Sequence, residues 1–128
     1  MTDIKTIMTA DPSGAELVAL AERTADQLVR AQLTRAKIRD IFTEVRRIEA
    51  LWEARPDVAL RRLNMLKPKL DYSVARAPEV QLLAQVLTQA IDQVQLADTP
   101  DERERRFRRF MDFFEAILAY HWAKGGRN

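Results

Sequence analysis

The sequence predicts an all-α protein, folded as a compact bundle of about five helices in a single domain. Glycine is scarce, with 3 residues in 128, and long stretches contain neither glycine nor proline. Strands would require more frequent turns. Apolar residues recur instead at three- and four-residue spacing, which places them on one face of a helix. A chain of this length forms one domain and removes roughly two-thirds of its unfolded surface from water.

The N-terminal part of the chain predicts a short tail and then the first helix. Residues 1–12 are expected to form a flexible tail, which leaves 13–128 as the helical-bundle domain. Ser13 and Glu16 have the spacing of a capping box, in which each side chain bonds a free backbone N–H of the other. This motif predicts that the first helix begins there and continues to about Gln32.

The middle of the chain predicts two more helices. Thr34 is the expected N-cap of a second, basic helix that ends near Arg55. Pro56 suits the first turn of a third helix, where its missing N–H costs nothing. Pro68 is expected to interrupt that helix, which then resumes as far as Arg76.

Two further helices complete the predicted bundle. Pro78 starts a fourth helix that is apolar on more than one side, so it is expected to be central or covered by another molecule. Thr99, Pro100 and Glu102 form a second capping box with proline at the first helical position. The last helix is expected to end near Lys124.

The composition leaves little material for catalysis. The chain has one histidine and no cysteine, which excludes disulfides and disfavours a zinc site. It also lacks a Gly-rich phosphate loop, so we expect no enzyme, no metal and no cofactor. His121 lies beside Ile117 and Leu118 on the apolar side of the last helix, which predicts a packed core or interface histidine.

No segment of the sequence indicates export or membrane insertion. Residues 1–13 lack the basic start and apolar centre of a signal peptide. The least charged stretch, 80–91, is too short and too polar to span a bilayer. We therefore expect a cytoplasmic protein without membrane contact.

Positive charge is concentrated in residues 35–76, which contain 11 Lys and Arg against 6 Asp and Glu. The whole chain has a net charge of only +2, and residues 77–102 contain acidic but no basic side chains. On the second helix, Arg35, Arg39 and Arg46 fall within roughly 40° of one another along about 16 Å of helix axis. The charge is therefore arranged in blocks, which indicates a polarised surface.

The basic stretch has two interpretations. A straight row of guanidinium groups can contact about two or three successive phosphates of a nucleic acid. An ordinary ion-paired helix surface explains the same row, because Asp40, Glu44 and Glu49 lie close to it. Lys67 and Lys69 favour the first interpretation somewhat, since irregular backbone at a helix break often presents functional groups.

A second basic run, at 103–109, is open to similar alternatives. Arg106 and Arg109 share a helix side with Phe113 and Tyr120, a mixture that suits base stacking or protein packing. Packing of these aromatic residues in the core is the preferred interpretation.

Three sequence blocks together resemble a known family. They are LTRAKIRDIFTEVRRI (33–48), LKPKLDYSVAR (66–76) and RFRRFMDFFEAILAYHWAKGG (106–126). In this order and spacing they resemble the small subunit of type III-A CRISPR effector complexes, the Csm small-subunit family. The resemblance implies a non-catalytic, all-helical, RNA-binding subunit that is present in more than one copy.

The resemblance also implies partners and a binding surface. Copies of the small subunit would stack as a filament along the guide RNA–target RNA duplex, facing the backbone subunits and adjoining the large signalling and nuclease subunit. Basic residues of the first two blocks would then contact the RNA backbone, and these are Arg35, Lys37, Arg39, Arg46, Arg47, Lys67, Lys69 and Arg76.

Two other functions are compatible with the residues. One is a helical scaffold that docks only proteins, with the basic stretch paired to an acidic segment such as 77–102 of another copy. The other is a DNA-binding helical dimer, which is disfavoured because no helix-turn-helix spacing with a glycine turn is evident.

Overall fold

The computed structural model describes residues 3–128, and this part of the chain forms six α-helices and one 3₁₀ turn. The predicted all-α class is confirmed, and the helices have the following bounds: α1 (Ile4–Thr9), α2 (Ala15–Arg30), α3 (Arg35–Trp52), α4 (Pro56–Arg76), η1 (Pro78–Val80, the 3₁₀ turn), α5 (Gln81–Gln95) and α6 (Pro100–Ala123).

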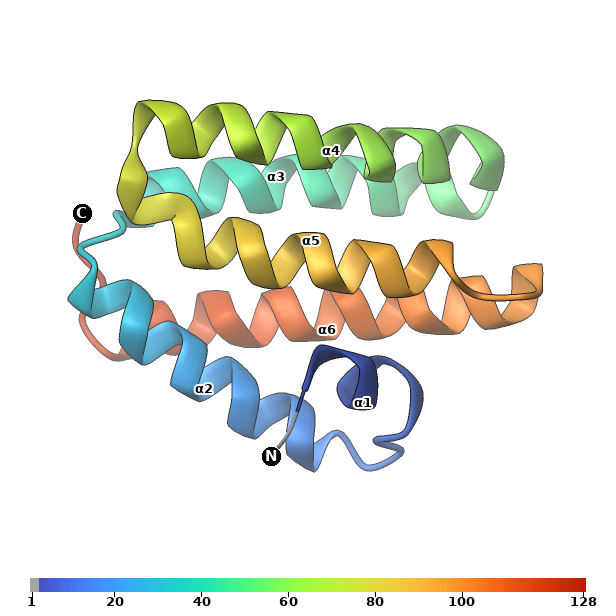
Figure 1. The fold of residues 1–128 in the computed structure, drawn as a ribbon, viewed down its shortest axis with the longest axis horizontal. Coiled ribbons are helices and arrows are strands. Elements are labelled where there is room, and N and C mark those ends of the chain that lie inside the picture. Colours follow the sequence, from blue (N-terminus) through green and yellow to red (C-terminus); the bar gives the residue numbers. More distant parts are fainter. Residues whose placement is uncertain (1–2) are drawn as a thin grey trace.

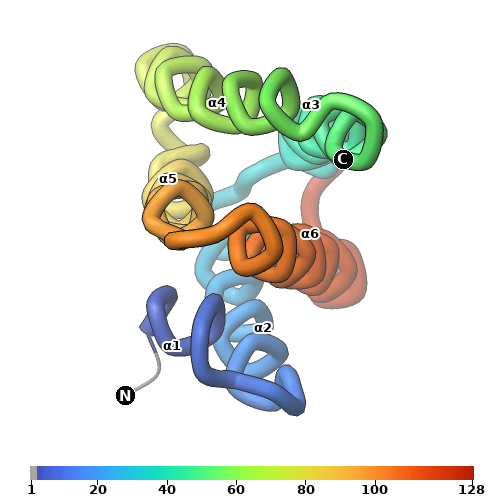
Figure 2. The backbone as a smooth tube through the Cα atoms, turned by 90° about the vertical axis from the view of Figure 1, so that its right-hand side faces the viewer, coloured from blue at the N-terminus to red at the C-terminus, as the bar shows by residue number. Residues whose placement is uncertain are grey.

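The long helices are arranged in three layers (Figures 1 and 2). Helices α3 and α4 form one outer layer, α5 and α6 the middle layer, and α1 and α2 the other outer layer. Helix α6 contacts α1, α2, α3 and α5, so it joins all three layers. Helix α5 lies in the middle layer and contacts α1, α2, α4 and α6, which agrees with the central position expected from its apolar sequence.

The core is built around four phenylalanines of α6. Phe107, Phe110, Phe113 and Phe114 are all completely buried. Trp52, at the end of α3, stacks on Phe107 with 4.1 Å between ring centroids and 7° between the ring planes. Such aromatic pairs contribute about 0.5–1.5 kcal/mol beyond the area they bury. The ring stack fixes the end of α3 on the middle layer.

Two of the predicted helix starts are confirmed. The Thr34 hydroxyl accepts a hydrogen bond from the Lys37 N–H at 3.2 Å, as an N-cap of α3 should. The Thr99 hydroxyl likewise accepts from the Glu102 N–H at 3.1 Å, and Pro100 occupies the first turn of α6.

The first long helix begins close to the predicted position, but the side chain that mainly caps it differs from the predicted one. Asp11 provides most of the capping of α2, because its carboxylate accepts from the N–H groups of Glu16 at 3.3 Å and Leu17 at 2.8 Å. The Ser13 hydroxyl accepts from the Ala15 N–H at 3.3 Å. Gly14 adopts the left-handed conformation with φ of 78°, and this turn brings Asp11 under the helix. An anion is favoured at this position by the helix dipole.

The structure also differs from the flexible tail expected at residues 1–12. Residues 4–9 form α1, and Ile4, Ile7 and Met8 are buried against the middle layer. A helix this short is unstable alone, so packing of its apolar side onto α5 and α6 stabilises it. Residues 1–2 of the expected tail lie outside the described residues.

Pro68 does not interrupt α4, contrary to the prediction. The helix is continuous from Pro56 to Arg76 with Pro68 inside it (Figure 1). Pro68 is exposed, so the backbone carbonyl that loses its N–H partner lies on the side of α4 that water reaches. The helix ends instead at Arg76, and Ala77 is extended before the 3₁₀ turn of Pro78–Val80.

The C-terminal segment returns to the start of α3. Gly125 turns the chain with φ of 88°, and the Arg127 carbonyl then accepts from the Arg35 N–H at 2.6 Å. The imidazole Nε2 of His121 donates to the Leu33 carbonyl at 2.7 Å and the residue is fully buried, so the predicted packed histidine is confirmed. A methyl group on the buried Gly126 would collide with the His121 ring.

We expect Gly126→Ala to lower the free energy of unfolding by about 1–3 kcal/mol, because it overpacks the site against the His121 ring. In a His121→Ala background the two ring contacts are gone and only the contact with the backbone carbonyl of residue 121 remains, so the cost should fall without vanishing. Urea unfolding of the four variants of this double-mutant cycle measures the coupling. Equal costs in both backgrounds would contradict the assigned contact.

Candidate nucleic-acid interface

The structure places the predicted RNA-binding residues in several environments. All of them lie on α3 or α4, in the outer layer at the top of Figure 1. The contacts of these residues differ, however. They place the residues in four environments: the α3–α6 edge, the α3–α4 groove, the α4–α5 contact and the open surface.

Arg35 and Arg46 lie on the α3–α6 edge. The Arg35 guanidinium lies over the Trp122 ring at 5.0 Å, and its Nη2 donates to the Trp122 carbonyl at 3.4 Å. Arg46 pairs with Glu49 at 3.1 Å and lies over the Phe42 ring at 5.7 Å. Arg35 therefore joins α3 to α6, whereas the contacts of Arg46 stay within α3 and 57% of its side chain is exposed.

Acidic side chains give this edge a mixed charge. Glu49 also accepts an ion pair from Arg108 on α6 at 3.5 Å. Partial burial raises the pKa of Asp112, and the nearby carboxylates of Glu115 and Glu49 raise it further. The α3–α6 edge is thus less basic than the sequence row suggested.

The α3–α4 groove is organised by Glu44. Its carboxylate, with 15% of its side chain exposed, accepts from Arg62 at 2.8 Å. Arg47 and Lys69 approach the same carboxylate at 3.6 Å and 3.8 Å. One anion therefore holds three cations in the groove, and two of these cations, Arg47 and Lys69, remain largely exposed.

A hollow of about 210 Å³ opens at the end of this groove where α4 ends. Lys37 lines it and pairs with Glu79 of the 3₁₀ turn at 3.3 Å. Arg76 lines it as well, with its guanidinium 5.8 Å from the centroid of the Tyr72 ring and its Nη1 donating to the Tyr72 hydroxyl at 3.3 Å.

Lys67 and Arg39 have contrasting positions. Lys67 pairs with Asp92 of α5 at 2.6 Å, so it joins two layers of the bundle. Its neighbour Lys69 points toward α3, because two residues in a helix lie about 200° apart. Arg39 is exposed, and within residues 3–128 its guanidinium makes no ion pair.

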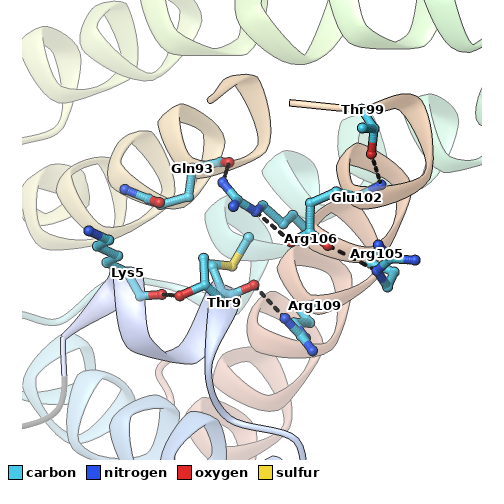
Figure 3. A network of polar contacts seen from close by, with 9 residues as sticks. Lys5, Thr9, Gln93, Thr99, Glu102, Arg105, Arg106 and Arg109 are labelled. Carbon is cyan, nitrogen blue, oxygen red and sulfur yellow. Dashed lines mark hydrogen bonds and ion pairs between the residues drawn. The ribbon is translucent and has the colours of Figure 1, made fainter. Parts of the chain in front are cut away.

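Two arginines of the basic run of α6 hold neighbouring helices, and the packing preferred from the sequence for the aromatic residue Phe113 is confirmed. Figure 3 shows Arg106 between Glu102 and Gln93, with its Nε donating to the Glu102 carboxylate at 2.9 Å and its Nη1 to the Gln93 carbonyl at 2.8 Å. Arg109 donates to the Met8 carbonyl at 2.7 Å. These arginines hold α5 and α1 on α6, and Phe113 is buried in the core.

Two residues outside the predicted RNA-binding set also shape this surface. Arg62 shares the Glu44 carboxylate, and Tyr72 exposes 63% of its surface beside Arg76. The spacing of Tyr72 and Arg76, four residues apart on one helix, could have indicated their contact. Nothing in the local sequence pairs Arg62 with Glu44, because they lie on different helices.

The described residues contain no group of three or more His, Cys, Asp or Glu side chains placed to hold a metal ion. Among the helices of residues 3–128, none combines the length and apolar character needed to cross a membrane.

Fold and surface together define a small all-helical protein with an exposed set of cations on one outer layer. A family model described as Csm2 Type III-A matches residues 11–127. The chain belongs to this family, the small subunit of type III-A CRISPR effector complexes, as its sequence blocks suggested. No curated protein and no solved structure shows a match to the chain.

We expect Asp112→Asn to stabilise the protein at about neutral pH. Because the pKa of Asp112 is raised by folding, its ionisation destabilises the folded state once the pH exceeds this pKa. Below the ordinary pKa of an aspartate the carboxyl is neutral in both states, and the effect vanishes. Asp112 and Glu115 are a like-charge pair three residues apart on α6, and removing such a pair raises the free energy of unfolding by about 0.2–0.5 kcal/mol. Urea unfolding at about pH 7 and about pH 3 measures the difference.

Asp71→Asn is the control for this comparison, because it removes the same charge from an exposed position on α4. A gain for Asp112→Asn that persists undiminished at low pH would show that its cause is not ionisation.

We expect Glu44→Gln to lower the free energy of unfolding by about 1–2 kcal/mol, since three cations lose their shared anion. Thermal unfolding across a salt series measures the loss, which should shrink as salt screens the wild-type ion pairs. Glu53→Gln is the control, because Glu53 is exposed just after α3 and makes no ion pair within residues 3–128. Equal effects of the two substitutions would count against the Glu44 ion-pair cluster.

Proposed function

We propose that this chain is a non-catalytic subunit that holds the backbone of the guide RNA–target RNA duplex on its α3–α4 layer. The observation that carries the proposal is a set of exposed cations of α3 and α4 that lie away from the mixed-charge α3–α6 edge and, within residues 3–128, make no ion pair or hydrogen bond with α5 or α6. We call this set the basic face, and its members are Lys37, Arg39, Arg47, Lys69 and Arg76.

The ion pairs of the basic face leave its cations available. Lys37, Arg47 and Lys69 are each about half exposed or more, and their pairs with Glu44 or Glu79 lie at 3.3–3.8 Å. Exposed pairs of this kind contribute only about 0–1 kcal/mol. A phosphate can therefore replace the carboxylate as partner at little cost.

This arrangement suits binding that ignores sequence. Contacts to phosphate position a nucleic acid but carry no base information. In RNA-guided systems, base pairing with the guide supplies the selectivity. A subunit that contacts only the backbone accepts any target, which a guided complex requires.

Arg35, Arg46 and Lys67 have a different role in this proposal. Arg35 contacts Trp122 of α6 and Lys67 contacts Asp92 of α5, and these two contacts connect the α3–α4 layer to the middle layer. Arg46 instead pairs with Glu49 of its own helix, on the mixed-charge α3–α6 edge. We propose that Arg35 and Lys67 hold the basic face in place, and that all three residues contribute less to RNA contact. The eight residues expected from the sequence thus reduce to five principal ones.

Stacking of copies completes the proposal. Residues 77–102 carry acidic and no basic side chains, so a neighbouring copy could approach this segment with cations. The same complementarity supports the alternative function, a scaffold whose basic face docks only protein. Self-association of the free chain without RNA, lost at high salt, would favour that scaffold.

We expect the chain to bind single-stranded RNA with an affinity that falls as salt rises, with a log–log slope near about −3 for about four phosphate contacts. Arg39→Glu should weaken binding and make the slope shallower by about 0.7 or more, with no change in melting temperature, because Arg39 is exposed and unpaired within residues 3–128. Fluorescence anisotropy across a salt series measures both quantities.

Arg23→Glu is the matched control, because Arg23 is an exposed arginine on α2, in the opposite outer layer. An equal loss in both variants would indicate that only net charge matters. Repeating the assay in the assembled effector complex separates weak binding by one copy from a protein-docking face. Salt-independent affinity in both settings would contradict the proposal.

A further inference from the structure

The hollow at the end of the α3–α4 groove combines an apolar lining with a polar edge. Ile41, Ala77 and Val80 supply apolar surface, and the other lining residues are Lys37, Asp40, Tyr72, Ser73 and Arg76. The Tyr72 side chain is among the most exposed large hydrophobic groups of the described chain. Its ring contributes little to the core, so a partner outside the bundle is the natural candidate for covering it.

We propose that this hollow is a stacking subsite for one unpaired base of an RNA strand, with Tyr72 as the stacking side chain. The inference rests on the proposed function, since the basic face must first hold the strand. Pockets for drug-sized ligands have volumes of about 300–1,000 Å³. The hollow, at about 210 Å³, is smaller than these and suits a single planar base.

The geometry of Tyr72 and Arg76 supports stacking. The guanidinium of Arg76 lies over the tyrosine ring at 5.8 Å, so the two planar groups already share one site. Aromatic rings and arginine planes are the surfaces on which unstacked RNA bases rest. Arg76 is exposed, and its long side chain is free to move toward a phosphate when a base takes its place.

The carboxylates favour a base in the hollow over a phosphate. Asp40 lines the hollow directly, and Glu79 lies next to it in the ion pair with Lys37. A phosphate placed there would meet the like charge of Asp40. An exocyclic amino group of a base can instead donate to that carboxylate, and the Ser73 hydroxyl can donate or accept. The cations around the hollow then remain available to contact the phosphates of the RNA backbone.

The same chemistry predicts a preference among bases. Cytosine, adenine and guanine carry an exocyclic amino group, whereas the one N–H that uracil offers on its pairing edge lies between two carbonyl oxygens, which the Asp40 carboxylate repels. The subsite should therefore bind an unpaired cytosine better than an unpaired uracil.

The test compares a fluorescent single-stranded RNA with a blunt duplex of the same sequence, using the full chain. Tyr72→Ala should weaken single-strand binding about 5- to 150-fold, the range measured for the loss of one stacked base. It should leave duplex binding and the salt slope unchanged, because no phosphate contact is lost. Tyr72→Phe should behave as wild type. Met65→Ala, which removes another exposed apolar side chain of α4, is the matched control.

Each other result overturns the inference in a distinguishable way. Salt-sensitive RNA binding that is unaffected by Tyr72→Ala would remove the subsite and leave the proposed function intact. If Tyr72→Ala lost the same affinity for the single strand and for the duplex, Tyr72 would be a positioning residue for the basic face and not a stacking residue. Unchanged RNA binding with failed assembly into the effector complex would assign the hollow to a protein side chain. No salt-sensitive binding by the wild-type chain or its complex would overturn both proposals.

Discussion

Burial of the α6 phenylalanines is the constraint on which the rest of the structure depends. Their rings leave α6 in more than one direction, so helices must cover it on several sides. Helix α3 is held there by the stack of Trp52 on Phe107 and by the edge contact of Phe42 with Phe114 at 5.1 Å. These contacts fix the rotation of α3 about its axis, and that rotation decides which of its cations face solvent.

Arginine has two different roles in this bundle, and the neighbours of each residue decide between them. Arg106 and Arg109 donate to backbone carbonyls of other helices, so their charges hold the bundle together. Arg39 and Arg47 lie on the outer layer, where a partner can reach them. Two arginines of the basic run of α6 are thus structural, although this run is the densest cluster of arginines in the chain.

The acidic residues of the α3–α4 layer give the basic face its form. Glu44 draws Arg47, Arg62 and Lys69 together, so their side chains are partly ordered before any ligand binds. Ordering of this kind reduces the entropy lost on binding. Asp40 disfavours a phosphate in the hollow beside them, so the surface that we propose for the RNA backbone is separate from the site that we propose for a base.

The sequence by itself determined the helical class, most helix bounds and the family. Local signals were sufficient for these, because the caps at Thr34 and Thr99 and the apolar periodicity act within a few residues of the chain. Only the tertiary structure decided that α1 packs, that α4 continues through Pro68, and that Lys67 and Lys69 serve different surfaces. The physical reason is that each of these depends on contacts or solvent exposure set by other helices, which no local pattern encodes.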